Sequence, residues 1–474
     1  MISEKAKSER EILKWEREKA KPKGKGYFIW LILVISLIYI TDEVASQIGT
    51  LMKTEIANDL LSKFGQSSVG MLDILSMVVV PFQVVCLFYK PLADKLGRKT
   101  FLVINTFGMS FALLLIFLSD NLVLYFLGAC MVQFFIPHDM HVVYIMETAP
   151  AKHRAKVYSS IKFVANMGVT LIPLLRRLLM REASEWRNVF LIPAVLGLVC
   201  SFIALISSRE TDAFIDSRLR WLKMTDAERA LAVSDNKAKS AQGGLGNALK
   251  FAFGHKQLKW LYITSAFVNM GFLLTLDYQV IMTYGYAEHF VKIGSFATLE
   301  EAVNAASVGI VTSAIFLFTI GSAVAQVIMG FVCDWKGRKV AAITMMTICT
   351  ISFIGFFLGS NMGISPYVVG FLCGACIGSY YATNDILIMM IGESSPTNLR
   401  SSTISAQFVV TAAGVVFSYG VGLPLITALG NSATGTILLC MTLPGFILAI
   451  VTLFTKTHDT TGVNMDTVTG CEWD

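Results

Sequence analysis

The chain has 474 residues, of which 54% are hydrophobic and 15% are charged, and its mean hydropathy is +0.63. This composition excludes an ordinary soluble globular protein. The net charge of +6 is small, and Lys and Arg gather in a few loops, so nucleic acid is not an expected partner.

Twelve long apolar segments follow a charged N-terminal stretch, and they form two groups of six. Each is long enough to cross a hydrocarbon core of about 30 Å as a helix. The predicted spans are 28–51, 68–89, 100–119, 122–146, 157–179, 188–208, 258–284, 307–332, 340–359, 366–391, 402–429 and 433–455. The predicted regions are an N-terminal tail (1–27), a six-helix bundle (28–208), a linker with amphipathic helices (209–256), a second six-helix bundle (257–455) and a C-terminal tail (456–474).

The short loops set the expected orientation. Lys and Arg are concentrated in loops 90–99, 147–156 and 333–339, on the same side as the N-terminal tail. Because positive loops stay in the cytoplasm, we expect both tails and the linker to be cytoplasmic. The first apolar run is expected to be a permanent span and not a cleaved signal. Short outer loops without an Asn-x-Ser/Thr sequon favour a bacterial cytoplasmic membrane.

One stretch of the sequence occurs twice. Residues 128–154 match residues 374–400 without a gap, with eight identical positions out of 27. Ordinary residue frequencies would give roughly two identities. The chain therefore contains two related halves in the same orientation, and we expect an all-α integral membrane fold with 12 transmembrane helices in two pseudo-symmetric six-helix bundles.

Charged motifs also recur at matched places in the two halves. Asp94-Lys-Leu-Gly-Arg-Lys99 returns as Asp334-Trp-Lys-Gly-Arg-Lys339. The glycine suits a tight turn, and a carboxylate with a guanidinium makes a strong charge-assisted bond. The repeated stretch adds a Glu and an Arg to each half. The full set is Asp94, Gly97, Arg98, Glu147 and Arg154 in the first half, and Asp334, Gly337, Arg338, Glu393 and Arg400 in the second.

These motifs in twelve spans closely resemble the major facilitator superfamily, above all its sugar-porter and organic-ion (metabolite–proton symporter-like) branches. The stretch His458–Asp466 is also similar to the ending of many members of those branches. The resemblance implies that the Glu–Arg pairs and the D-x-x-G-R loops form cytoplasmic clasps, closed in the outward-open state. It also implies one central site between the bundles that opens alternately to each side.

Among the carboxylates inside the predicted spans, four form two matched pairs. Asp42 and Asp277 occupy equivalent places in spans one and seven, and Asp139 and Asp385 in spans four and ten. A charged carboxylate at mid-bilayer costs about 2.5–3.5 kcal/mol. Each must therefore face a wet cavity, be paired or be protonated, so we predict a role in proton coupling or solute binding.

Two histidines flank Asp139. His138 and His141 are three residues apart on a helix, and imidazole titrates near neutral pH. In the sequence repeat, Asn384 of the second half aligns with His138 of the first. One half thus has a titratable group where the other has a neutral amide, a pattern that fits asymmetric proton coupling. The alternative is that Asp139 is a fixed ion-pair partner of Lys162. With no third ligand, we predict no metal site.

Other side chains complete the predicted site. Phe134 corresponds to Tyr380 in the repeat, and Tyr381 follows it; these aromatics either line a substrate cavity or pack the helices. Arg176 and Arg177, near the outer end of span five, either receive an anion or form an exposed helix end.

The sequence predicts a secondary active transporter, with proton-coupled uptake of a small organic solute. No nucleotide-binding loop or nucleophile–base set indicates an enzyme, and no cofactor is expected. The partners are the solute, protons and the lipid bilayer, and we expect a monomer. The alternatives are proton-antiport efflux of amphipathic organic cations and a transporter-like nutrient sensor. The chain lacks the Gln-Gln pair of sugar porters in span seven and the Gly-Pro-x-x-Gly-Gly of drug antiporters in span five, so substrate identity and charge stay open.

Overall fold

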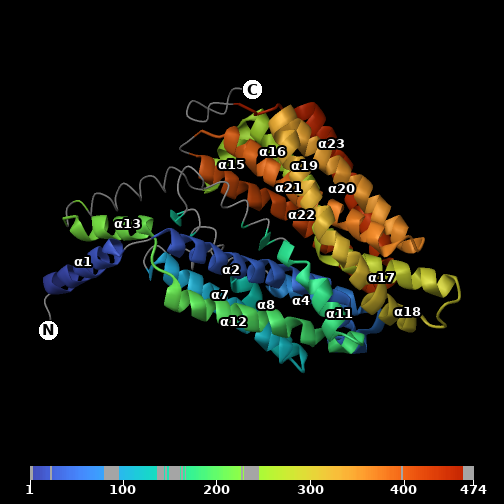
Figure 1. Ribbon diagram of the computed structural model, residues 1–474. Helices are drawn as coiled ribbons and strands as arrows, with labels where there is room; N and C mark the ends of the chain where they lie inside the picture. Colours follow the sequence, from blue (N-terminus) through green and yellow to red (C-terminus); the bar gives the residue numbers. More distant parts are fainter. Residues whose placement is uncertain are drawn as a thin grey trace. The chain divides into compact units, whose positions relative to one another are not determined.

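The protein is described from a computed structural model (Figure 1). The described residues are 4–21, 24–79, 96–135, 144, 147–148, 161, 164–165, 167–225, 228, 245–396 and 399–462. Within these ranges the regular structure is helical, without a strand.

Eight helical segments of the described chain are long and apolar enough to cross a membrane. They are Lys25–Leu51, Arg98–Phe117, Ala183–Ser207, Lys256–Lys292, Leu299–Lys336, Arg338–Asn361, Ser402–Leu429 and Asn431–Lys456. Ser68–Val79 (α4) and Leu122–Phe135 (α8) are shorter apolar helices. At 1.5 Å per residue, 20 residues span about 30 Å, the thickness of the hydrocarbon core.

The chain divides into two compact units, and the first comprises Met1–Gly49, Leu75–Met180 and Ser184–Asn236. In it, α7 (Arg98–Phe117) packs against α12 (Asn188–Ser207) and α8 (Figure 1). A Cβ on Gly197 of α12 would lie 2.0 Å from Ser110 Oγ of α7, so the glycine permits this close approach. The core joins α2 (Lys25–Leu51) to α7 and α12 through buried apolar side chains such as Ile35, Phe101 and Cys200. The unit also contains α11 (Leu171–Leu179) and the 3₁₀ turn η5 (Ala183–Arg187), part of which falls in the second unit.

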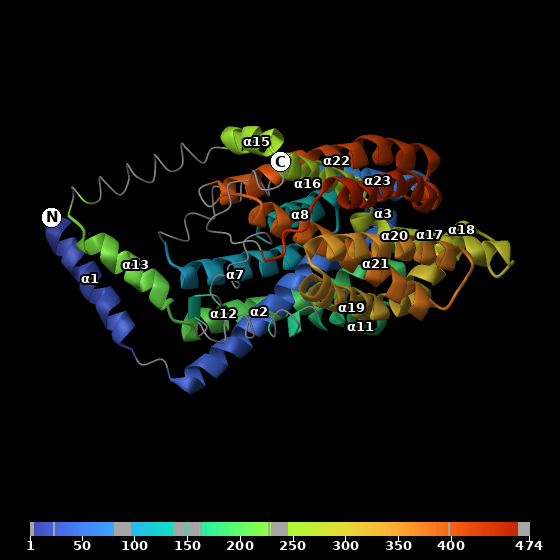
Figure 2. The ribbon, with the colours of Figure 1, turned by 90° about the horizontal axis from the view of Figure 1, so that it is seen from above.

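Two polar helices of the first unit lie side by side in both Figure 1 and Figure 2: α1 (Glu4–Ala20) and α13 (Asp212–Lys223). Salt bridges of 2.8 Å join Arg218 to Glu11 and Lys223 to Glu16. The rings of Trp15 and Phe214 meet edge to face with centroids 5.5 Å apart. Charged outer faces and a small aromatic seam explain why these amphipathic segments form helices without entering the apolar core.

The second unit comprises Thr50–Ile74, Arg181–Ala183 and Lys237–Asp474. Its central helix is α21 (Pro366–Glu393), which packs against α19 (Thr312–Lys336) and α20 (Arg338–Asn361). A Cβ on Gly370 or Gly374 would lie within 2 Å of a carbonyl oxygen of α19. These small residues therefore allow backbone-to-backbone packing, the usual means of joining helices in lipid.

The remaining helices of the second unit surround that core. They are α3 (Lys53–Leu60), η1 (Ser62–Ser67), α15 (Leu245–Gly254), α16 (Lys256–Asn269), α17 (Leu274–Lys292), α18 (Leu299–Ala305), η6 (Ala306–Val311), α22 (Arg400–Leu429), η7 (Asn431–Ala433) and α23 (Thr434–Lys456), with α4 shared between the units. α16 packs against α22 and α23, and α3 packs against α17.

The span predicted at 258–284 is interrupted in the structure. α16 ends at Asn269 and α17 begins at Leu274. The break is stable because the Ser418 hydroxyl accepts a hydrogen bond from the Leu273 N–H at 3.1 Å, so a backbone donor freed by the turn is not left unpaired. A second irregularity is η6, a π-helical turn that leads into α19; such turns are frequent at functional sites.

Candidate functional site

The first ion-pair cluster, which we define as Arg98, Glu147, Glu210 and Thr211, lies at the start of α7. Arg98 Nε donates to Glu147 Oε1 at 3.0 Å. The Thr211 hydroxyl donates to the other oxygen of Glu147 at 2.6 Å. Both oxygens of Glu147 are therefore bonded, and a half-buried ion pair is joined to the beginning of α13.

Glu210 caps α7 in the same cluster. It accepts from the Arg98 N–H at 2.9 Å and the Lys99 N–H at 3.2 Å, two donors that have no partner within the helix. Gly97 has φ 105° and ψ 153°, a conformation open essentially to glycine only. A Cβ there would lie 2.3 Å from Glu210 Oε2. Burial raises the pKa of Glu210 above its ordinary value, against the lowering effect of these hydrogen bonds.

The second ion-pair cluster, Arg338, Glu393, Asp459 and Thr460, repeats this arrangement at the start of α20. Arg338 Nε donates to Glu393 Oε1 at 3.3 Å, and the Thr460 hydroxyl donates to Glu393 Oε2 at 2.5 Å. Asp459 accepts from the Lys339 N–H at 3.0 Å. Gly337 has φ 90°, and its Cβ would lie 2.4 Å from Asp459 Oδ2.

The remaining predicted clasp residues differ in their placement. Asp334 is exposed at the end of α19. Arg400 bonds to the end of the preceding helix, with its Nε 2.9 Å from the Gly392 carbonyl oxygen. Asp94 and Arg154 lie outside the described residues.

The sequence placed Asp459 and Thr460 in the stretch similar to the ending of family members, without a role in the clasp, and Glu210 and Thr211 were not predicted. An acidic residue followed by Thr occurs just after the sixth and the twelfth predicted spans, and this recurrence is the signal that would have found all four.

A neutral polar cluster, the amide cluster of Asn269, Tyr380 and Asn384, lies within the second unit. Asn269 Nδ2 donates to Asn384 Oδ1 at 3.0 Å, and the Tyr380 hydroxyl donates to Asn269 Oδ1 at 2.9 Å. Tyr380 is buried, whereas the two amides are half-buried. The cluster offers hydrogen-bond donors and acceptors without a charge.

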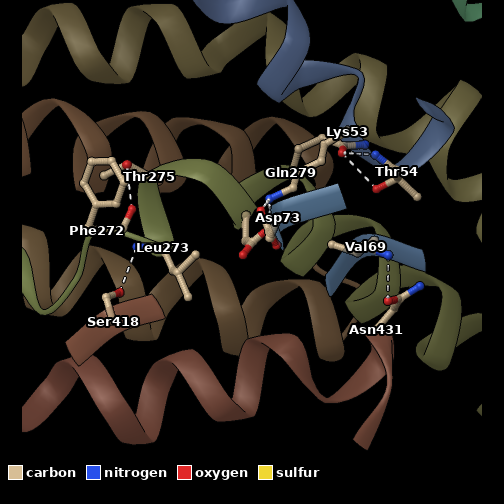
Figure 3. A network of polar contacts seen from close by, with 11 residues as sticks. Lys53, Thr54, Val69, Asp73, Phe272, Leu273, Thr275, Gln279, Ser418 and Asn431 are labelled. Atoms are coloured by element: carbon tan, nitrogen blue, oxygen red, sulfur yellow. Dashed lines mark hydrogen bonds and ion pairs between the residues drawn. The ribbon is translucent and has the colours of Figure 1, made fainter. Parts of the chain in front are cut away.

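The buried charge cluster consists of Lys53, Asp73 and Asp277, all in the second unit. Lys53 and Asp73 are labelled in Figure 3. The Lys53 ammonium donates to Oδ1 of both Asp73 and Asp277. The side chain of Lys53 is 6% exposed, and those of both aspartates are 0% exposed. Asp277 is therefore paired, one of the three states expected for a carboxylate within a span.

A polar network continues from this cluster. Gln279 accepts from the Thr54 N–H at 3.1 Å and from the Thr54 hydroxyl at 2.9 Å (Figure 3). Glu55 accepts a hydrogen bond from the hydroxyl of Ser307, which lies in the π-helical turn η6. Residues 50–74, which precede the linker, are thus bonded to helices that follow it.

The sequence reasoning also passed over Lys53 and Asp73. Asp73 lies inside an apolar span, as Asp42 does, so the same criterion applied to every predicted span would have found it. Lys53 lies two residues beyond the predicted end of span one, where a charge is common and carries no signal.

The other predicted site residues are dispersed. Asp42 is half-buried in α2, and Asp385 is exposed in α21. Phe134 packs edge to face on Phe135 at 4.9 Å, and Tyr381 is 44% exposed. His138, Asp139 and His141 lie outside the described residues.

The two outer arginines have opposite environments. Arg176 is buried and Arg177 is exposed. Among the residues that the structure describes, no group of three or more His, Cys, Asp or Glu side chains is arranged to hold a metal ion.

Comparisons with known proteins agree on the fold. The facilitated glucose transporter member 4 of solute carrier family 2 from Mus musculus is 24% identical over 138 residues, which are 29% of this chain and 26% of that protein. The chain thus spans about a quarter of the length of the curated relatives it matches.

Two solved structures match nearly the whole chain. The inward-open xylose transporter XylE from E. coli has a TM-score of 0.61 at 15% identity, over 93% of this chain and 98% of that chain. A D-xylose-proton symporter has a TM-score of 0.58 at 17% identity, over 92% and 99%. At such identities the likeness shows the fold alone.

A family model described as the Major Facilitator Superfamily matches residues 27–389. That range is most of the chain, and the all-helical architecture with its apolar spans agrees with the twelve-helix fold of the family. The protein therefore belongs to the Major Facilitator Superfamily, whose members are transporters and not enzymes.

Proposed function

We propose that the protein is a proton-coupled uptake carrier for a small polar organic solute, working by alternating access. The observation that carries this proposal is the presence of the same ion-pair cluster in each half of the sequence. Arg98 with Glu147 and Arg338 with Glu393 make equivalent bonds at equivalent places. Two matched pairs that break and re-form together give a carrier two states of similar free energy.

The strength of these pairs suits such a role. The side chains of Arg98, Glu147, Arg338 and Glu393 are between 16% and 23% exposed. Water therefore reaches each pair and limits its stabilisation. Binding of a solute shifts an equilibrium only by its difference in affinity for the two states, so weak pairs are the ones that a small solute and a proton can open.

The amide cluster supports an uncharged, hydroxyl-bearing solute. Its members recognise hydroxyl groups by hydrogen bonds and offer no counter-charge. The similar proteins are named as glucose and xylose transporters, and those solutes are of this class.

Coupling to protons is proposed on the carboxylates within the spans: Asp42, Asp139, Asp277 and Asp385. His138 and His141 stay proposed partners of Asp139. The D-xylose-proton symporter shares the fold and gives a precedent for coupling on this architecture. With both tails in the cytoplasm, as the basic loops favour, the two ion-pair clusters would face the cytoplasm of a cell membrane.

The test begins with a thermal-shift screen of the purified chain against pentoses, hexoses, nucleosides, carboxylates and amines, because a bound solute raises the melting temperature. The stabilising compound is then followed into proteoliposomes with an inward proton gradient. We expect accumulation that a protonophore abolishes. Accumulation that survives the protonophore, or export driven by the gradient, contradicts the proposal.

A matched pair of variants tests the site. Asn384→Ala removes one amide of the amide cluster, and one hydrogen bond worth about 0.5–1.5 kcal/mol corresponds to a roughly 2- to 12-fold weaker affinity. Asn361→Ala is the control, since Asn361 donates only to a carbonyl of its own helix in the described chain. Equal effects of the two variants would remove the amide cluster from the solute site.

A further inference from the structure

The buried charge cluster carries more negative than positive charge. One ammonium, that of Lys53, serves two carboxylates, Asp73 and Asp277. Oδ2 of each aspartate is buried and has no hydrogen-bond partner among the described residues. An unpaired charge or an unsatisfied polar oxygen at such depth is costly, so the cluster lacks one positive charge.

The groups that the structure describes around the cluster do not supply that charge. Glu55 of α3 is acidic and adds no positive charge; it accepts a hydrogen bond from the Ser307 hydroxyl and lies in the first turn of α3. Tyr419 of α22 carries a phenol, which supplies no positive charge. Gln279, also beside the cluster, is neutral and is engaged with Thr54.

A metal ion fits this gap poorly. Hard cations such as Ca²⁺ and Mg²⁺ take six or more oxygen ligands, whereas the cluster presents two open carboxylate oxygens. A proton needs only one oxygen to bind and leaves an O–H that donates to the other carboxylate. Two close carboxylates sharing one proton are the usual solution to this electrostatic problem.

We propose that Asp73 and Asp277 together bind one proton from water, so that the Lys53 cluster is neutral while residues 50–74 are bonded to α17. Binding forms one carboxyl O–H bond, and release returns that proton to water. Release leaves one net negative charge buried, which favours entry of water and separation of residues 50–74 from α17. This inference rests on the proposed carrier function and assigns its coupled proton to a specific pair.

The proton is measured without any solute. The full chain in lipid nanodiscs is titrated by pH-difference infrared spectroscopy, in which a protonated carboxyl gives a carbonyl stretch that shifts in D₂O. We expect one such band in the unaltered protein and its loss in both Asp73→Asn and Asp277→Asn. Asp59→Asn, the same change on an exposed carboxylate of α3, keeps the band.

Folding gives a second readout. An amide resembles a protonated carboxyl, so each single Asn variant is expected to keep a melting temperature close to that of the unaltered protein. The double variant leaves Lys53 buried without a carboxylate and should be lost to aggregation. Failure of both single variants to fold overturns the inference, because it means that both charges are needed.

Other outcomes separate this inference from the proposed function. If uptake is proton-driven and the band survives both substitutions, the pair is not the proton site and the carrier proposal stands. If the band is lost in both variants while uptake does not depend on the proton gradient, the proton site at Asp73 and Asp277 is supported and the proposed proton coupling of uptake is contradicted. A band that responds to Na⁺ at constant pH identifies a metal-ion site and overturns the inference.

Discussion

The first and second ion-pair clusters have the same bonding pattern but differ in burial. In the first, the capping carboxylate of Glu210 is 6% exposed and accepts from two successive backbone N–H groups. In the second, Asp459 is exposed and accepts from one of them, while the Thr461 hydroxyl accepts from the other at 3.0 Å. The same cap is thus buried in the first cluster and exposed in the second.

Their surroundings explain the difference. Glu210 leads directly into α13, which Thr211 caps by accepting from the Phe214 N–H at 3.3 Å. The Phe214 ring then lies 5.8 Å from the Arg98 guanidinium. Asp459 instead lies beyond the end of α23, in a stretch without regular secondary structure. Glu210 is therefore held between the start of α7, which it caps, and the start of α13, which follows it.

The largest contrast is expected from alanine at the two glycines. Gly97→Ala and Gly337→Ala each force a side chain into a backbone conformation that costs about 1–3 kcal/mol. In Gly97→Ala the new Cβ also displaces the buried Glu210, whereas in Gly337→Ala the exposed Asp459 can swing away. Thermal unfolding in detergent should show the larger loss for Gly97→Ala. Equal losses would mean that burial of the cap is unimportant.

A smaller contrast is expected from removal of the caps. Glu210→Ala leaves two N–H groups of α7 without their acceptor and should cost about 1–3 kcal/mol. Asp459→Ala removes an exposed cap, typically worth about 1 kcal/mol. Both are measured as changes in unfolding free energy at one pH, and a larger cost for Asp459→Ala would reverse the comparison.

The cap of the first cluster also predicts a pH dependence. Because burial raises the pKa of Glu210 in the folded state, protonated Glu210 is favoured by folding. The stabilisation by protonated Glu210 is complete below the pKa of Glu in the unfolded chain, about 4.3. This stabilisation is lost as the pH rises through the raised pKa of the folded state. The stability of the unaltered protein relative to Glu210→Gln should therefore fall over that interval, and a difference that is flat with pH would contradict the assignment.

The smallest effect is expected at α1 and α13, the two polar helices of the first unit. Glu11→Gln breaks the ion pair with Arg218. The side chain of Glu11 is 36% exposed and that of Arg218 is 28% exposed, so the loss of unfolding free energy should be about 0.2–1 kcal/mol. The hydrogen bond from Arg218 lowers the pKa of Glu11. The contribution is therefore present above about pH 4.3 and is lost as the pH falls through the lowered pKa. Glu9→Gln on the same helix, where the side chain is exposed, is the control.

The sequence predicted the transporter fold because hydropathy and a 246-residue repeat are local, additive signals. It also predicted that Arg98, Glu147, Arg338 and Glu393 act together, since a duplicated motif marks its own members. It did not predict that Lys53 pairs with Asp73 and Asp277. Lys53 and Asp277 are 224 positions apart, and no sequence pattern indicates that they are in contact.

The break after Asn269 was missed for a similar reason. Residues 258–284 are apolar enough for one continuous helix, and Asn269 and Gly271 are only weak local signals for an end. The turn depends on the Ser418 hydroxyl, which is 145 positions away. Hydrophobicity thus predicts which segments enter the membrane, and polar side chains from distant segments determine where their helices bend.

The packing of α1 on α13 provides the protein with a natural optical reporter. The indole of Trp15 touches Phe214, and Phe214 lies against Arg98, the arginine of the first ion-pair cluster. Tryptophan emission responds to changes in the contacts of its ring. An opening of the Arg98–Glu147 bond would therefore change the emission of Trp15, two contacts away. A Trp15→Phe protein, which keeps the other six tryptophans, gives the background emission.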